Sequence, residues 1–198
     1  MSNAFWYAAS RASVLAAGNL AGAFERVSKF CAGAALLLNF SGNMAHIHEK
    51  IDFTVAIFIV HDGKVLLIHH RKLDKWLPLG GHIELDEDPE QAALREEREE
   101  SGLDVELLGE RPPTTSPGTR ALIAPRFLDI HRINDTHEHI GMIYWARPKN
   151  SAAIKLATAE HHDIRWCSLE DMEKLSPPMT GAVKWYCRQA IGEISSRP

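Results

Sequence analysis

The sequence predicts an α/β fold in which helices cover both faces of a mixed β-sheet, an α/β/α sandwich. Two apolar segments, residues 53–60 and 65–70, flank the turn sequence His-Asp-Gly-Lys, and this pattern predicts a β-hairpin. Residues 89–101 are rich in strong helix formers, and a closing helix is expected over residues 179–194. Together with the strands that follow the first helix, these elements predict a sheet between two helical layers.

The ends of the first helix follow from its capping residues. Asp88 is a favourable N-cap, and Pro89 suits the first helical position, where its missing N–H costs nothing. Gln91 lies three residues after Asp88 and completes a capping box. Gly102 provides a left-handed stop, so the helix is expected over residues 89–101.

The rest of the chain supplies further strands and a short helix. Residues 111–119 are expected to form a loop, because their prolines and hydroxyl residues oppose a strand ladder. Ser168 is the expected N-cap of a helix over residues 168–175, with Asp171 at its third position. A long loop is expected over residues 71–85, and strands over residues 105–110, 121–133, 139–148 and within 155–169, with 121–133 and 139–148 antiparallel.

A fixed spacing of glycine, arginine and glutamate residues follows the hairpin. The segment GHIELDEDPEQAALREEREESGL covers residues 81–103. At average composition each fixed residue is roughly a one-in-fifteen chance, so seven in register arise at random on the order of once in 10⁸. The spacing is therefore a specific signal, and its seven residues are Gly81, Glu87, Arg95, Glu96, Glu99, Glu100 and Gly102.

Three carboxylates of this segment share one face of the expected helix. Glu96, Glu99 and Glu100 are spaced i, i+3, i+4, and like charges at that spacing repel. A solvated acidic face would be the ordinary interpretation, but the only basic residues nearby are Arg95 and Arg98. Clustered carboxylate oxygens suit a hard divalent cation, so we expect Mg²⁺ or Mn²⁺ here.

This spacing resembles the Nudix box, the signature of the Nudix hydrolase superfamily. The resemblance covers about residues 50–175 and implies an α/β/α sandwich with a mixed sheet. It also implies metal-dependent hydrolysis of a pyrophosphate bond in a nucleoside diphosphate linked to another group, by attack of water on phosphorus. The expected substrate is a nucleotide, a nucleotide sugar or a compound of the ADP-ribose type.

The resemblance assigns roles to residues of the box. The implied metal ligands are Glu96, Glu99 and Glu100, joined by the backbone carbonyl of Gly80. Arg95 orients a neighbouring carboxylate, and Glu87 supports the loop and the helix. The general base is open: Glu96 is a candidate within the box, and Glu138 and Glu160 are candidates outside it.

Candidates for substrate binding lie in the loop before the helix. Arg71 could contact phosphate, Trp76 could stack on a base, and Gly81 allows a close approach of the backbone. One residue departs from the pattern: Glu97 replaces the usual bulky aliphatic side chain. We expect its stem to cover apolar surface while its head reaches solvent, with weakened packing of the helix.

The composition describes an ordinary soluble domain with a modest extension. The 198 residues are 45% hydrophobic and 24% charged. A net charge of −4 gives no electrostatic case for nucleic-acid binding, so no such partner is expected. Homodimer formation, common among Nudix domains, is an open expectation.

The cysteines and histidines carry weaker signals. Cys31, Cys167 and Cys187 lack CxxC spacing, which favours a reducing compartment, and we expect a cytoplasmic protein. His137 and His139 would share one face of a strand. Because no cysteine or third histidine has ligand spacing nearby, a structural zinc site is not predicted.

The first part of the chain differs from the rest. Residues 1–47 are expected to be a weakly structured or helical extension without a catalytic role, and residues 48–195 to be the Nudix domain. The apolar run 31–40 is too short to span a bilayer, so no membrane partner is expected. Basic residues before this run resemble a signal or transit peptide, but no convincing cleavage site follows. A start at Met44 is an alternative.

Two other functions share the implied fold. An isomerase of the isopentenyl diphosphate type needs a reactive cysteine facing a glutamate, and neither Cys167 nor Cys187 has a recognisable context for it. A non-catalytic module that senses a nucleotide typically lacks box glutamates, and this chain keeps them all. The enzyme is therefore the favoured interpretation.

Overall fold

The computed structural model describes residues 50–113 and 116–196, and the predicted extension over residues 1–47 lies outside these ranges. Within them, seven strands form a mixed sheet in the order β3-β2-β1-β6-β4, with β5 also paired to β6 and β7 to β2. The strands are β1 (Ile51–His61), β2 (Lys64–His70), β3 (Lys75–Leu77), β4 (Val105–Leu108), β5 (Phe127–Asn134), β6 (His137–Pro148) and β7 (His161–Cys167). The helices are α2 (Pro89–Ser101), α3 (Leu169–Glu173) and α4 (Gly181–Ser195).

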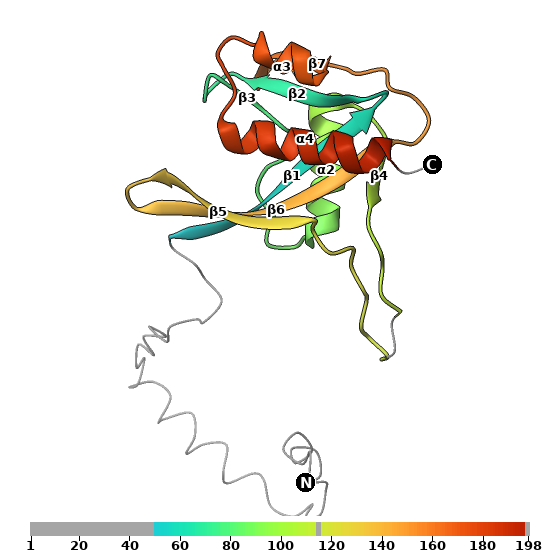
Figure 1. Ribbon diagram of the computed structural model, residues 1–198. Helices are drawn as coiled ribbons and strands as arrows, with labels where there is room; N and C mark the ends of the chain where they lie inside the picture. Colours follow the sequence, from blue (N-terminus) through green and yellow to red (C-terminus); the bar gives the residue numbers. More distant parts are fainter. Residues whose placement is uncertain (1–49, 114–115, 197–198) are drawn as a thin grey trace, which may run out of the picture. The chain divides into compact units, whose positions relative to one another are not determined.

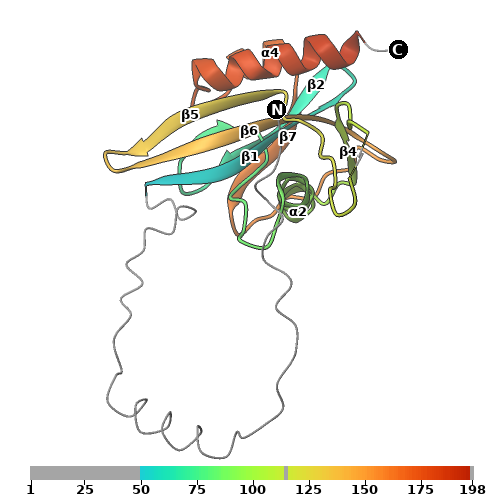
Figure 2. The ribbon, with the colours of Figure 1, turned by 90° about the horizontal axis from the view of Figure 1, so that it is seen from below.

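Helices α2 and α4 lie on opposite faces of the sheet (Figures 1 and 2). Side chains of β1 alternate between the two layers, as the period of a strand requires. Val55 and Ile57 pack in the core beside Ala92 of α2, whereas Phe58 packs in a second core beside Ala190 of α4. The predicted α/β/α sandwich is confirmed.

The hairpin between β1 and β2 has the predicted turn. Asp62 and Gly63 both have positive φ, 48° and 70°, which is the geometry of a two-residue primed turn. The two strands pair only near this turn, at Val60 with Val65 and at His61 with Lys64. Beyond it they part, so β1 has room for another segment along its edge.

The segment before α2 fills that edge of β1. The amide N–H groups of Ile57 and Val55 donate to the carbonyls of Leu79 and Gly81, at 2.8 and 2.9 Å. On its other edge β1 pairs in parallel with β6 over nine residues, from Ile51 to Ile59. Strand β1 is therefore held on both sides, and it positions the loop that leads into α2.

Helix α2 has the predicted bounds and caps. The Asp88 side chain accepts hydrogen bonds from the amides of Glu90 and Gln91, and the capping box with Gln91 is present. Gly102 ends the helix in the left-handed region, with φ of 69°. Ser168 likewise caps α3 with Asp171 at its third position, as predicted.

The structure departs from the predicted elements chiefly at β5 and β3, while several other ends shift by one or two residues. The strand expected from residue 121 begins at Phe127. The N–H of Ile123 donates to the carboxylate of Glu90, and Pro125 has no N–H to donate, so this stretch cannot form a regular ladder. Strand β3 lies in the segment expected to be a loop, and its three residues are too few to show a periodic pattern.

No helix in the described ranges combines the length and the apolar character needed to cross a bilayer.

The head of Glu97 does not reach solvent, contrary to expectation. The residue is 1% exposed, and its carboxylate accepts a hydrogen bond of 3.3 Å from the Ser101 hydroxyl. Burial raises the pKa of Glu97 to about 7, against an ordinary value of 4.5. The helix is therefore fully packed at this position, at the cost of a desolvated carboxyl group.

Replacing Glu97 with leucine should stabilise the protein more at pH 8 than at pH 5. Because the pKa is higher in the folded chain, the folded state binds more protons between the two pKa values, and stability falls as pH rises through that window. The gain of Glu97→Leu should grow by about 1–3 kcal/mol from pH 5 to pH 8. Urea unfolding with a chelator present measures it.

Glu170→Leu is the matched control, because the Glu170 side chain is 81% exposed. An equal gain for Glu97→Leu at both pH values would contradict the assignment of a raised pKa.

Candidate functional site

Two glycines let the loop before α2 lie close to its neighbours. Gly80 has φ of 140°, and a Cβ there would lie 2.1 Å from the carbonyl oxygen of Val55. A Cβ on Gly81 would lie 2.3 Å from Oε1 of Glu96. Larger residues would therefore push the loop from β1 or displace a carboxylate of α2.

Arg95 connects the loop with the helix. Its guanidinium holds both carboxylate oxygens of Glu87, with Nε at 2.6 Å and Nη2 at 3.0 Å. It also donates to Glu96 at 2.8 Å, to Glu99 at 3.2 Å and to the carbonyl of His82 at 3.1 Å. Hydrogen bonding to Arg95 lowers the pKa of Glu87, which stays ionised. Arg95 thus fixes the geometry of three carboxylates at once.

Glu100 is held by one backbone amide and lies against a buried imidazole. The residue is 4% exposed, and its Oε2 accepts a hydrogen bond of 2.8 Å from the amide of Gly80. Its Oε1 lies 2.9 Å from Nε2 of His161, although this contact is not aligned as a hydrogen bond. His161 is fully buried, and neither ring nitrogen has a hydrogen-bond partner among the described residues.

The box carboxylates span a gradient of exposure from solvent to core. The Glu99 side chain is 61% exposed, Glu96 is half-buried and Glu100 is buried. Burial raises the pKa of Glu96, and the nearby Arg95 opposes this shift. The exposed Glu99 can therefore contact a ligand that arrives from solvent, while the buried Glu100 stays fixed.

The donors present fit a divalent cation. Potential ligand atoms of Glu100, Glu160 and His161 lie within 4.8 Å of one another. Carboxylate oxygens suit Mg²⁺ or Mn²⁺, and the unpartnered nitrogens of His161 are unusual for a buried side chain. The residues therefore suit the predicted metal, with Glu160 adjacent to the box.

The candidates outside the box lie in different surroundings. Glu160 belongs to the group around Glu100, whereas Glu138 does not and stands at the start of β6. Arg71 is used within the protein: its backbone amide donates to the carbonyl of Glu160 and its guanidinium to that of Thr158, at 2.9 and 3.0 Å. It holds the segment that carries Glu160.

Trp76 is part of the core. It is 3% exposed, and its indole N–H donates to the carbonyl of Ser176 at 3.2 Å. His69 stacks on it at 5.1 Å, and the guanidinium of Arg165 lies 4.8 Å from its ring centre. Stacking on a substrate base would require these contacts to open.

Sequence reasoning missed His161 as a partner of the box. Its position at the first residue of β7 carries no local signal, because Glu100 lies far away along the chain. The pairing of β7 with β2 places His161 opposite His70, and in the fold its Nε2 lies beside Glu100 of α2.

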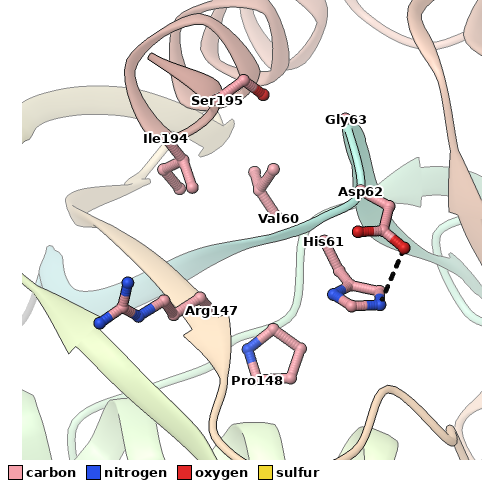
Figure 3. Close-up of a pocket in the computed structure, with 8 residues that line it drawn as sticks. All are labelled: Val60, His61, Asp62, Gly63, Arg147, Pro148, Ile194 and Ser195. Carbon is pink, nitrogen blue, oxygen red and sulfur yellow. Dashed lines mark ion pairs between the residues drawn. The ribbon is translucent and has the colours of Figure 1, made fainter. Parts of the chain in front are cut away.

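A pocket at the far end of β1 contains none of the predicted site residues (Figure 3). Its lining includes the His61–Asp62 pair, 3.3 Å apart, and Arg147.

The sequence profile of the NUDIX domain matches residues 50–186, which is more than half of the chain. The chain belongs to the Nudix family. The match extends from β1 through the box into the first residues of α4, so the resemblance predicted from residues 81–103 is confirmed.

Relatives of known function are enzymes acting on nucleotides. The CTP pyrophosphohydrolase of Escherichia coli (strain K12) is 32% identical over 118 residues, which cover 56% of this chain and 87% of the relative. The asymmetrical bis(5'-nucleosyl)-tetraphosphatase of Caenorhabditis elegans is 28% identical over 110 residues, covering 51% and 64%. The prediction that the chain is a Nudix enzyme of the pyrophosphohydrolase type is confirmed.

Solved Nudix structures share the fold. A Nudix hydrolase from Clostridium perfringens superposes with a TM-score of 0.63 at 32% identity, covering 72% of this chain and 97% of that one. The Ap4A hydrolase of Caenorhabditis elegans gives a TM-score of 0.55 at 19% identity, covering 75% and 99%, and supports the fold alone.

Gly81→Ala should impair this Nudix site without unfolding the protein. The added methyl group would meet Glu96, whose carboxylate must move from its place beside Arg95. We expect Mn²⁺ affinity to fall at least about tenfold, the effect typical of a disturbed ligand shell. Calorimetric titration with Mn²⁺ measures this.

Gly192→Ala is the control, since a Cβ there meets nothing within 4 Å. Unchanged Mn²⁺ binding by a folded Gly81→Ala variant would show that Glu96 is no ligand.

Proposed function

We propose that this protein is a divalent-cation-dependent pyrophosphohydrolase that cleaves a nucleoside diphosphate linked to another group. One observation carries the proposal: Arg95 and the Gly80 amide hold Glu96, Glu99 and Glu100 along one face of α2, beside the glycine loop. Family membership and the two nucleotide-cleaving relatives support the same reaction.

The metal ligands in this proposal are Glu96, Glu99, Glu100 and the carbonyl of Gly80. These residues would hold Mg²⁺ or Mn²⁺, which would supply a lowered pKa for the attacking water and neutralisation of charge on the leaving phosphate. The residues of the chain supply the positioning. Arg95 keeps Glu96 and Glu99 in place, and the Gly80 amide orients Glu100 so that one of its oxygens faces His161.

The proton of the attacking water needs an acceptor. Glu160 lies within reach of Glu100, and the backbone bond from Arg71 holds it there. Glu96 is the alternative within the box, and burial raises its pKa toward the range of a general base. We propose Glu160 as the base, with Glu96 as a metal ligand.

The two competing functions have less support. Burial raises the pKa of Cys167 to about 11 and that of Cys187 to about 12, so neither thiol is a ready nucleophile or acid. Cys31 lies outside the described residues. A sensor module has no need of the carboxylate set that this chain keeps. The substrate class follows the relatives, with a nucleoside triphosphate or a dinucleoside polyphosphate first; cytoplasmic location and a homodimer stay predictions.

Product release from a panel of nucleotides tests the function. The panel contains CTP, the other nucleoside triphosphates, diadenosine tetraphosphate, ADP-ribose and nucleotide sugars, each with Mg²⁺, with Mn²⁺ and with a chelator. We expect one class to be cleaved well above the others, with activity abolished by the chelator. Silence across the panel from a protein that binds Mn²⁺ would contradict the proposal and favour the isomerase or the sensor.

Glu99→Gln should reduce turnover by two or more orders of magnitude, since loss of a charged ligand weakens the metal's stabilisation of the transition state. The fold should persist, because the Glu99 side chain is mostly exposed. Glu170→Gln, another exposed glutamate on a helix, should retain full turnover. Steady-state rates and thermal unfolding of the two variants give the comparison.

The variant Glu160→Gln distinguishes a general base from a metal ligand. If Glu160 accepts the proton and is not itself a ligand beside Glu100, its replacement should lower kcat and remove the acidic limb of the pH–rate profile, while Mn²⁺ affinity changes little. The matched variant is Glu138→Gln, which should keep the wild-type profile. An unaltered acidic limb in Glu160→Gln would move the role of base to Glu96.

A further inference from the structure

A cluster of imidazoles and one carboxylate lies outside the carboxylate site of the box. We call it the histidine cluster. Its residues come from four segments, namely β1, the box loop, β5 and β6, and they are Asp52, His82, His131, His137 and His139. The proposed hydrolysis uses none of these side chains.

Strand register brings these side chains to one face of the sheet. Asp52 of β1 stands opposite His139 of β6, and His139 stands opposite His131 of β5. His82 stands opposite Thr54, two residues after Asp52, and therefore points to the same side. Four segments thus converge on one patch.

This face of the sheet is the one on which α4 packs. Asp129, two residues before His131, accepts a hydrogen bond of 2.8 Å from the Tyr186 hydroxyl of α4. The box carboxylates are carried by α2, which lies on the other side of the sheet (Figure 2). The cluster is therefore separate from the metal site of the box.

The distances within the cluster match metal coordination. Nε2 of His137 lies 3.1 Å from Oδ2 of Asp52, and Nε2 of His82 lies 3.5 Å from the same oxygen. Ligand atoms of Asp52, His137 and His139 are all within 4.8 Å of one another. Tetrahedral zinc with bonds of about 2.05 Å separates its ligand atoms by about 3.3 Å, so small side-chain rotations would complete the shell.

His139 stands at the centre of the cluster. Its ring centroid lies 4.9 Å from that of His82, 5.1 Å from that of His137 and 5.6 Å from that of His131. Imidazole is the commonest metal ligand among protein side chains.

We propose that Asp52, His137 and His139, with His82 as the fourth ligand, bind a transition-metal ion of the Zn²⁺ class. Imidazole nitrogens select zinc and its neighbours over Mg²⁺, which prefers oxygen ligands. The site is distinct from the box carboxylates on α2, although His82 belongs to the box segment, and it does not depend on the proposed hydrolysis. It ties β1, β6 and the box loop together at the end of the sheet.

Zinc titration of the full-length protein against a chromophoric chelator tests the site. We expect wild type to bind one Zn²⁺ that remains in Glu99→Gln, because Glu99 belongs to the box. His137→Asn and His139→Asn should each weaken binding of this ion at least about tenfold, since loss of even an outer-shell partner costs that much. His61→Asn, which removes a histidine paired with an aspartate elsewhere, should bind like wild type.

Replacement of Zn²⁺ by Co²⁺ gives a second readout, because its visible absorption distinguishes a four-coordinate nitrogen site from an oxygen site. Thermal unfolding in the presence of a chelator checks that each variant is folded without the metal ion. Should a histidine variant not fold, Asp52→Asn, which keeps all the imidazoles, takes its place and is expected to weaken the same ion. Wild-type zinc affinity in the folded cluster variants, or loss of the zinc in Glu99→Gln, would overturn the proposal.

Discussion

The guanidinium of Arg95 is the contact on which the site depends. It binds Glu87 before the helix, Glu96 and Glu99 on the helix and the carbonyl of His82 in the loop. Without it, three carboxylates and a carbonyl dipole would face one another with little to offset their repulsion. The Arg95 side chain is 28% exposed, so water screens its ion pairs with these glutamates only in part. One cation therefore lets a loop and a helix rich in acid share a small volume.

Arg95 can act in this way because the sheet opens beside β1. Strands β1 and β2 pair only at their turn, and residues 79–83 take the place of β2 along the edge that is left. Gly80 passes so close to Val55 that a side chain would collide with the backbone. The loop is thereby held as firmly as a strand, and its carbonyls and amides become fixed parts of the site. Rigid support of this kind is what electrostatic catalysis requires.

Features encoded locally could be predicted from the sequence. The caps of α2 and α3, the Asp62-Gly63 turn and the register of the box all depend on residues within a few positions of one another. Features set by distant pairing could not. The late start of β5 depends on Glu90 binding the amide of Ile123, a residue far along the chain.

The burial of Glu97 is a second feature that the sequence could not predict. From the sequence, a glutamate on an acidic helix is expected to send its head to solvent. In the fold the carboxylate is enclosed and bonded to Ser101, which itself donates to the carbonyl of Glu97 at 2.9 Å. The helix thus tolerates a polar residue in an apolar position by supplying a local hydroxyl partner. Neither the enclosure nor the raised pKa is visible in composition or spacing.

The loop before α2 serves two faces of the sheet. Because successive residues of an extended segment point to opposite sides, Gly81 faces Glu96 of α2 while His82 faces His139 on the α4 side. The backbone carbonyl of His82 nevertheless binds Arg95. A displacement of His82 through its imidazole would therefore also shift the carbonyl that the Arg95 guanidinium binds. The two proposed metal sites differ chemically, with carboxylates on the α2 side of the sheet and mainly imidazoles on the α4 side, but both use the same short stretch of backbone.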